Sequence, residues 1–373
     1  MKTKGALLWE PGTNSGWSVE DIEIDPPKQH EVMVKLAASG ICHSDNHFDD
    51  GVIPIPFAPL LGGHEGAGVI TEVGPGVDDL VVGDHVVMSF LPACGHCDLC
   101  ASGRGNLCVL GAGILGGLAP DGTHRVHARG QGVGCMSYLG TFAPYVCAPV
   151  NAVTKIGKDI PLDKAALIGC GVPTGWGSSV YAADMQLGDT VVVIGIGGVG
   201  INAVQGAVHK GARDIIAIDP VAFKRDKAKE FGATHAVATY EEAAPILAQL
   251  TNGQGAHRVI ITVGVMTGDL LEGAEVMTRP GGVMVLTSAA PATQLDVKIN
   301  LFSLAMSGKR LQGSLYGNTI ARNDVARICD LYRGGRLKLD ELITQTYRLE
   351  DINQAFSDMR EGKNLRGVII YDD

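Results

Sequence analysis

The sequence predicts an α/β protein with two parts, a mainly β body and a parallel sheet flanked by helices. Residues 3–90 run as short strands between Pro and Gly turns, typical of half-buried antiparallel strands. After Asp189, apolar runs of strand length alternate with helical patterns, which indicates a doubly wound parallel sheet. Six strands are expected there, at residues 191–195, 215–218, 235–238, 259–263, 283–287 and 311–315.

The stretch VVVIGIGGVGINAVQGAVHKGARDIIAIDP, residues 191–220, reads as strand, tight turn, helix and strand. Gly195 allows the turn, Gly197 lets a pyrophosphate approach the backbone, and Gly200 lets the helix pack on the strand. The helix start offers free N–H groups to phosphates. The alternative is a plain glycine-rich turn, but strand, helix and glycines all fall in place. The stretch therefore predicts a Rossmann dinucleotide site.

Asp219 closes the second strand of this unit. A carboxylate there accepts both ribose hydroxyls of an adenosine, and no arginine follows it directly to pair with a 2'-phosphate. The sequence therefore favours NAD over NADP.

Composition excludes several classes of function. The 373 residues are 46% hydrophobic and 19% charged, which suits a globular chain, and the net charge of -10 is spread without a basic face for nucleic acid. No apolar run reaches the roughly eighteen residues of a membrane helix, and MKTKGALLWEPG lacks a signal-peptide core. We expect a cytoplasmic protein that binds neither nucleic acid nor membrane. Its nine cysteines then point to metal or catalysis before disulfides.

Four cysteines gather in residues 91–148, a loop-rich region without a periodic core: Cys94, Cys97, Cys100 and Cys108. Four soft ligands with no open position describe a closed tetrahedral zinc site that ties the lobe down. Disulfides and coincidence are the weaker alternatives.

A second, dispersed set comprises Cys42, His64 and Cys170, each beside glycines. Any one alone is more often structural. Together, two thiolates and one imidazole leave the fourth zinc position open for substrate. Asp45 and Glu65 are candidate carboxylates behind the ligands, with a surface salt bridge as the alternative.

These motifs resemble the zinc-dependent, medium-chain alcohol dehydrogenases over essentially the whole chain. The similarity rests on GHEGAG at 63–68, the four-cysteine cluster, GCGVPTGWGS at 169–178 and GIGGVG at 195–200. Within the family the chain is most similar to the actinobacterial nicotinoprotein branch, assayed with N,N-dimethyl-4-nitrosoaniline, through GALLWEPGTNSGWSVE, DPVAFKR and YRGGRLKLDEL. In that branch NAD is held tightly and recycled in place.

The resemblance implies a GroES-like catalytic domain, residues 1–171 plus 315–373, carrying two zinc ions, and an NAD-binding Rossmann domain at 172–314. The reaction would lie in the cleft between them, where zinc stabilises an alkoxide and hydride passes to the nicotinamide. It also implies a homodimer or homotetramer, with an unknown redox acceptor if NAD(H) stays bound.

Roles follow at matching positions. Cys42, His64 and Cys170 would be catalytic zinc ligands with Glu65 an occasional fourth, and Ser44 would pass the alcohol proton through the ribose to His47, unless His47 is merely an exposed helix residue. Phe90 and Leu315 would wall the substrate pocket, with ordinary core as the alternative. Coenzyme contacts are expected from His43, Thr174, Gly195, Gly197, Gly198, Val199, Gly200, Asp219, Lys224 and Arg366.

Two departures narrow this prediction. His43 stands where many relatives place an arginine, which weakens phosphate neutralisation. Residues 109–117, VLGAGILGG, carry no charge to grip a glutathione carboxylate, so an apolar alcohol is favoured. The alternatives are an ordinary alcohol dehydrogenase with exchanging NAD, and a catalytically silent NAD-binding structural protein, which would have no need of this catalytic set.

Overall fold

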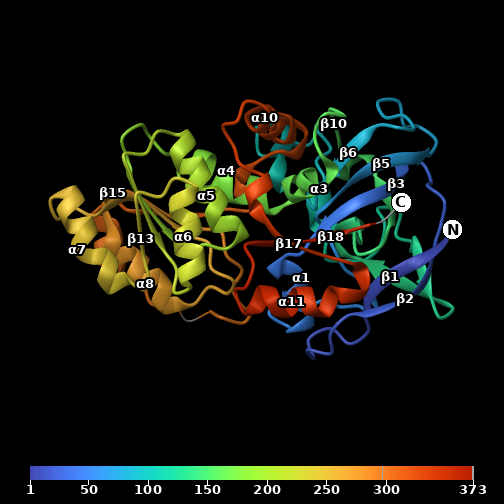
Figure 1. The fold of residues 1–373 in the computed structure, drawn as a ribbon, viewed down its shortest axis with the longest axis horizontal. Coiled ribbons are helices and arrows are strands. Elements are labelled where there is room, and N and C mark those ends of the chain that lie inside the picture. The colour runs from blue at the N-terminus through green and yellow to red at the C-terminus, as the bar shows by residue number, and fades with distance from the viewer. Residues whose placement is uncertain (296, 372–373) are drawn as a thin grey trace. The chain divides into compact units, whose positions relative to one another are not determined.

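A computed structural model describes residues 1–295 and 297–371 (Figure 1). The chain forms two compact units. The first unit comprises Met1–Cys170 and Ile320–Asp373, and the second unit comprises Gly171–Thr319. In the described ranges, no helix is both long enough and apolar enough to cross a membrane.

The first unit contains a closed barrel of short strands. Apolar side chains on alternate strand positions, such as Leu7, Ile22 and Ile24, fill its interior. In barrel order the strands are β1 (Lys2–Leu8), β2 (Ser18–Ile24), β7 (Val126–Ala128), β8 (Gln131–Cys135) and β4 (Leu60–Leu61).

A second sheet completes the first unit, and its central strand β3 (Glu31–Gly40) is an apolar run that is mostly buried. Strand β18 (Arg366–Ile370), near the C-terminus, pairs antiparallel with β3, so that Val368 lies opposite Gly40. The order is β10 (Val153–Ile156), β6 (His85–Met88), β5 (Gly66–Val73), β3, β18 and β17 (Ile343–Tyr347), and β9 (Tyr145–Pro149) also pairs with β3.

Short helices connect these strands. Helix α1 (His43–Asp49) begins two residues after β3, and the turn η5 (Ala166–Gly169) ends at Cys170. The other helices of the first unit are α2 (Asp98–Ala101), α3 (Leu162–Ala165), α10 (Ala321–Arg333) and α11 (Ile352–Arg360), with single turns η1 (Gly105–Leu107), η2 (Val109–Gly113), η3 (Met136–Tyr138), η4 (Val150–Ala152), η8 (Asp340–Leu342) and η9 (Leu349–Asp351).

The second unit is the expected six-stranded parallel sheet, and the α/β prediction is confirmed. Its order is β13 (His235–Val237), β12 (Asp214–Ile218), β11 (Thr190–Ile194), β14 (Ala256–Ile261), β15 (Thr278–Leu286) and β16 (Arg310–Gly313). Order reverses beside β11, the strand that leads into the glycine loop, and dinucleotides bind at such a switch point. Strand β15 begins at Thr278, earlier than expected, because Pro280 and the glycines after it resemble a turn in sequence.

Helices lie on both faces of this sheet. Helices α5 (Gly198–His209) and α6 (Ala222–Glu230) contact each other and β12 (Figure 1). Helix α7 (Tyr240–Thr251) also contacts β12, and it packs on α8 (Gly268–Met277), which contacts β14 and β15. Thr239 caps α7 by accepting the N–H of Glu242, and the Glu242 carboxylate in turn accepts the N–H of Ala238. The remaining elements are α4 (Gly171–Gly177), α9 (Leu301–Met306), the π turn η6 (Ser178–Ala182) and η7 (Tyr316–Asn318).

Two candidate metal centres and a dinucleotide site

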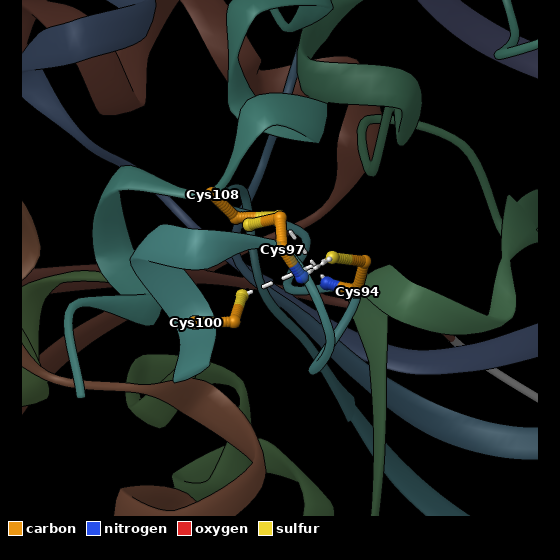
Figure 2. A group of neighbouring side chains, drawn as sticks. All are labelled: Cys94, Cys97, Cys100 and Cys108. Atoms are coloured by element: carbon orange, nitrogen blue, oxygen red, sulfur yellow. Dashed lines mark hydrogen bonds between the residues drawn. The ribbon is translucent and has the colours of Figure 1, made fainter. Parts of the chain in front are cut away.

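The four clustered cysteines converge in space (Figure 2). Cys94 and Cys97 lie on the loop before α2, Cys100 lies in α2 and Cys108 follows η1, and the four sulfurs lie within 4.8 Å of one another. Their backbone helps to orient them: the N–H of Cys97 donates to the Cys94 sulfur at 3.3 Å, and that of Cys94 donates to the Cys108 sulfur at 3.2 Å.

The sulfur spacing fits zinc. The Sγ atoms of Cys94 and Cys100 are 3.9 Å apart, as are those of Cys97 and Cys108. A tetrahedron with Zn–S bonds of about 2.3 Å has edges of about 3.8 Å, whereas a disulfide bond measures about 2.04 Å. All nine cysteines are free of disulfides. The donor set and the geometry therefore match a closed tetrahedral site.

The dispersed set also converges: one ligand atom each from Cys42, His64, Glu65 and Cys170 lie within 4.8 Å of one another. Cys42 is the N-cap of α1, and His64 and Glu65 lie between β4 and β5. Glycines allow this approach. A Cβ atom on Gly63, whose φ is +88°, would lie 2.6 Å from the Phe142 nitrogen.

Asp45 orients the His64 ring. Its Oδ2 atom lies 3.2 Å from Nδ1 of His64, and its Oδ1 accepts the Gly63 N–H at 2.8 Å. Both side chains are buried. A carboxylate against Nδ1 places the ring proton there and leaves Nε2 as the metal-binding nitrogen.

Glu65 is held by Arg366. One guanidinium nitrogen of Arg366 donates to Glu65 Oε2 and, at 3.2 Å, to the carbonyl of Ile41, and both side chains are buried. Burial raises the pKa of Glu65 to about 7, although Arg366 opposes that shift. The pairing occupies one carboxylate oxygen and leaves Oε1 4.0 Å from His64 Nε2. Contact between Arg366 and a pyrophosphate stays a prediction.

Cys42, which is half-buried, and Cys170, which is buried, shift each other's pKa. A hydrogen bond from Cys170 holds the pKa of Cys42 well below its usual value, assisted by His64, and raises the pKa of Cys170. Burial alone would lower the pKa of His64, but the charges of Asp45 and Cys42 raise it well above its usual value. A metal needs both thiolates and the neutral imidazole, so its binding displaces these protons.

Two further residues expected at this centre, Ser44 and Phe90, contact its candidate ligands. Ser44 Oγ is 3.7 Å from the Cys42 sulfur, and Phe90 packs its ring edgewise on His64 with 5.6 Å between centroids. His47 lies on α1, where its side chain is 3% exposed, which excludes the solvent-exposed alternative. The ring centroid of His43 is 6.3 Å from that of His47.

The glycine loop has the shape that a dinucleotide needs. Gly195 has φ of +86°, and α5 begins after Gly197 without a side-chain cap on its N-terminal N–H groups. A Cβ atom on Gly197 would meet nothing within 4 Å, so the backbone there is open to a phosphate. Gly198 and Val199 form the first turn of α5.

Asp219 is fixed at the end of β12. Its Oδ2 accepts the N–H of Ile196 at 2.7 Å and its Oδ1 that of Val221 at 2.9 Å, so the carboxylate is buried beside the glycine loop. Lys224 lies in the first turn of α6. Arg225 was not foreseen; its guanidinium donates to the carbonyls of Asp219 and Pro220 at 2.9 and 2.8 Å. The sequence did offer one indication of this contact, because Arg225 is a basic residue in the helix that follows Asp219.

Thr174 and Val199 lie on touching segments of the second unit. A Cβ atom on Gly175 would lie 1.9 Å from the Val199 carbonyl oxygen, so α4 and α5 meet through a glycine. Leu315 precedes η7 and is 44% exposed, so it is not an ordinary core residue. Their contacts with nicotinamide and substrate stay predictions.

Comparison with known proteins agrees with this chemistry. The Alcohol dehydrogenase GroES-like domain matches residues 28–158, and the Zinc-binding dehydrogenase domain matches residues 198–333. The chain is similar to NDMA-dependent alcohol dehydrogenase of Amycolatopsis methanolica, with 48% identity over 100% of this chain and 99% of that protein. It is 47% identical to Alcohol dehydrogenase B of Mycobacterium tuberculosis, again over 100% of this chain and 99% of the relative.

Solved structures show the same fold. A zinc-binding alcohol dehydrogenase domain protein from Burkholderia ambifaria superposes with a TM-score of 0.92 at 31% identity, covering 100% of both chains. Benzyl alcohol dehydrogenase from Acinetobacter calcoaceticus superposes with a TM-score of 0.91 at 29% identity, also covering 100% of both chains. The chain belongs to the zinc-dependent medium-chain alcohol dehydrogenases, oxidoreductases that use zinc and NAD, and within them to the actinobacterial branch.

Proposed function

We propose that this protein interconverts a small, apolar or primary alcohol and its aldehyde, with an NAD(H) that stays bound between turnovers. The first unit would be the catalytic part and the second unit would hold the coenzyme. One observation carries the catalytic assignment: Cys42, His64 and Cys170 offer three ligand atoms, while Glu65 is held by Arg366. That set leaves one position of a tetrahedral zinc for substrate.

The chain's own residues prepare the chemistry. When bound, zinc supplies a Lewis acid for the alcohol oxygen and NAD⁺ supplies a hydride acceptor. Asp45 keeps His64 in the tautomer that binds metal. Ser44 takes up the hydroxyl proton beside Cys42, and His47, one helical turn later, receives it from the relay.

The preference for an apolar substrate rests on one contact of the dispersed cluster and on the composition of one segment. Phe90 packs an aromatic ring against His64 in a T-shaped arrangement. The uncharged segment 109–117 offers nothing to grip an anionic thiol adduct. Both features favour an alcohol with a hydrocarbon or aromatic body.

Retention of the coenzyme is supported by the similarity to the NDMA-dependent enzyme. An enzyme with retained NADH needs a second molecule to take the hydride back, either an aldehyde or an external redox acceptor. We also propose a homodimer or homotetramer, because α9 exposes Leu301, Phe302 and Met306. Light scattering after gel filtration measures that state.

The decisive experiment purifies the protein without added nucleotide, denatures it and quantifies released NAD(H). About one nucleotide per chain is expected, together with oxidation of benzyl alcohol only when N,N-dimethyl-4-nitrosoaniline is present. A nucleotide-free protein that reduces added NAD⁺ overturns retention and leaves an ordinary alcohol dehydrogenase. A protein with two zinc ions that turns over no alcohol under either condition overturns the catalytic proposal.

A further inference from the structure

A carboxylate lies behind His47. Asp50 is the C-cap residue that follows helix α1, and its Oδ2 atom is 3.7 Å from Nδ1 of His47. The His47 side chain is buried, whereas that of Asp50 is 24% exposed. This separation is an ion-pair distance, and catalytic contacts of this kind tighten when substrate binds.

Three hydrogen bonds fix Asp50 in that place. Its Oδ2 atom accepts from the Asn46 amide at 2.7 Å, and its Oδ1 accepts from the Val52 N–H at 3.0 Å. Its own N–H donates to the carbonyl of Asn46 at 2.9 Å. Because both carboxylate oxygens are engaged, rotation would break a bond, and Oδ2 stays turned toward His47.

The orientation of Asn46 is unambiguous. Nη1 of Arg360, the last residue of α11, donates to Asn46 Oδ1 at 2.8 Å. A guanidinium has only donors and a carboxylate only acceptors, so the amide between Arg360 and Asp50 must face its oxygen to the first and its nitrogen to the second. Asn46 is buried, and reversing its amide would lose both bonds at once.

We propose that Asp50 is a positioning residue for His47, held in place by Asn46 and Arg360. The inference rests on the proposed role of His47 in proton transfer. Asp50 accepts the Nδ1 proton of His47, so Nε2 keeps the lone pair that receives the relayed proton. On transfer, the donor's O–H bond breaks and an Nε2–H bond forms. The product is an imidazolium beside a carboxylate.

The other charged or titratable groups near His47 do not substitute for Asp50. His43 is on the same helix, with 6.3 Å between ring centroids, and carries no negative charge. Asp49, the neighbouring acid, is turned to the Gly16 N–H, which its Oδ1 accepts at 3.1 Å. Arg360, from α11, contacts Asn46.

A double-mutant cycle on the purified zinc enzyme tests this, with benzyl alcohol and N,N-dimethyl-4-nitrosoaniline as probes. His47→Gln and Asp50→Asn should each lower kcat, Asp50→Asn by about tenfold or more, with little change in KM. The double variant should lose no more than His47→Gln alone, because Asp50 acts through His47. Asp50→Glu should restore part of the loss. Glu361→Gln, an exposed neighbour of Arg360, should behave as wild type.

Nitrogen-15 spectra of labelled histidines give a readout besides activity. The His47 ring should be protonated at Nδ1 in the wild type and a mixture of tautomers in Asp50→Asn. If Asp50→Asn does not fold, Arg360→Gln takes its place. That variant should show a smaller change in the His47 tautomer ratio and a smaller loss in kcat.

The outcomes separate the two proposals. Full activity of His47→Gln removes the relay role of His47 itself. Three other results overturn the role of Asp50 alone. The first is a loss of kcat in His47→Gln with an unchanged kcat in Asp50→Asn, and the second is losses of kcat that multiply in the double variant. The third is a His47 tautomer that stays the same in Asp50→Asn.

Discussion

A Cβ atom on Gly200 would lie only 1.9 Å from the carbonyl oxygen of Gly195. Three residues earlier, Gly197 has φ of -87° and open space around its Cβ position. Gly200→Ala should therefore destabilise the protein by about 1–3 kcal/mol, because backbone must shift to admit the methyl group. Gly197→Ala should leave the melting temperature of the nucleotide-free protein unchanged and abolish NAD binding. Calorimetry and nucleotide content distinguish the two, and an equal loss of stability in both would contradict this assignment.

Cys42→Ala should remove one of two zinc ions and lower kcat/KM by at least about a thousandfold, because the metal supplies the Lewis acid. Cys329→Ala is the matched control, since that buried cysteine lies in α10 and outside both clusters. Zinc is measured by inductively coupled plasma mass spectrometry. Full turnover in Cys42→Ala would contradict the metal assignment.

Cys100→Ser should affect stability before chemistry. Helix α2 contributes no buried residue. The bound metal would therefore hold this lobe together in place of a hydrophobic core. A loss of about 3 kcal/mol would lower the melting temperature by about 6–12 °C for a unit of this size. The catalytic zinc should remain, and folding unchanged after loss of one zinc would show that the lobe does not depend on it.

Asp219→Asn should weaken NAD binding by about tenfold to a hundredfold. The amide would present donors where Ile196 N–H, Val221 N–H and the ribose hydroxyls all need acceptors. Isothermal titration of the nucleotide-free protein measures the change. The preference for NAD over NADP should fall with it, because the charge that repels a 2'-phosphate is gone while Arg225 and Lys224 remain.

Removal of zinc should expose a reactive thiolate. The N–H groups of Val109 and Cys100 lower the pKa of Cys97 to about 6. The folded pKa lies below the ordinary value of 9.0, so the thiolate stabilises the lobe. That stabilisation is complete above the ordinary value and is lost as pH falls through about 6.

In chelator-treated protein, iodoacetamide should label Cys97 about tenfold more slowly at pH 5 than at pH 7. Cys135 is the internal control, because burial raises its pKa to about 12 and it should stay unlabelled in the folded protein. Peptide mapping by mass spectrometry measures both. Equal labelling of Cys97 with and without zinc would contradict ligation.

The sequence predicts the second unit well because its β-α alternation is local. Each strand there is an apolar run between helices, and the glycine loop marks the first. Strand β17 was not predicted, because apolar and polar residues alternate only weakly in its sequence, ITQTY, and the strand is half exposed. Barrel closure by β4 and β8 also has no local signal, because Leu60–Leu61 is only two residues long.

The candidate site divides in the same way. Both cysteine sets follow from motifs, but their partners depend on tertiary contacts. Arg366 donates a hydrogen bond to Glu65, and Arg360 donates one to Asn46, so each bond joins segments from opposite ends of the chain. Only folding brings those segments together, so a single sequence carries no trace of either contact.

The two metal clusters differ in how far apart their ligands lie along the chain. Residues 94–108 contain one complete set, whereas the other needs residues 42, 64 and 170. During synthesis on the ribosome, the compact set can capture zinc as soon as its short loop emerges, because closing a short loop costs little entropy. The dispersed set must wait until the strands of the first unit have assembled and Cys170 has left the exit tunnel. Zinc starvation during growth should therefore yield folded chains with one ion, deficient at the catalytic centre.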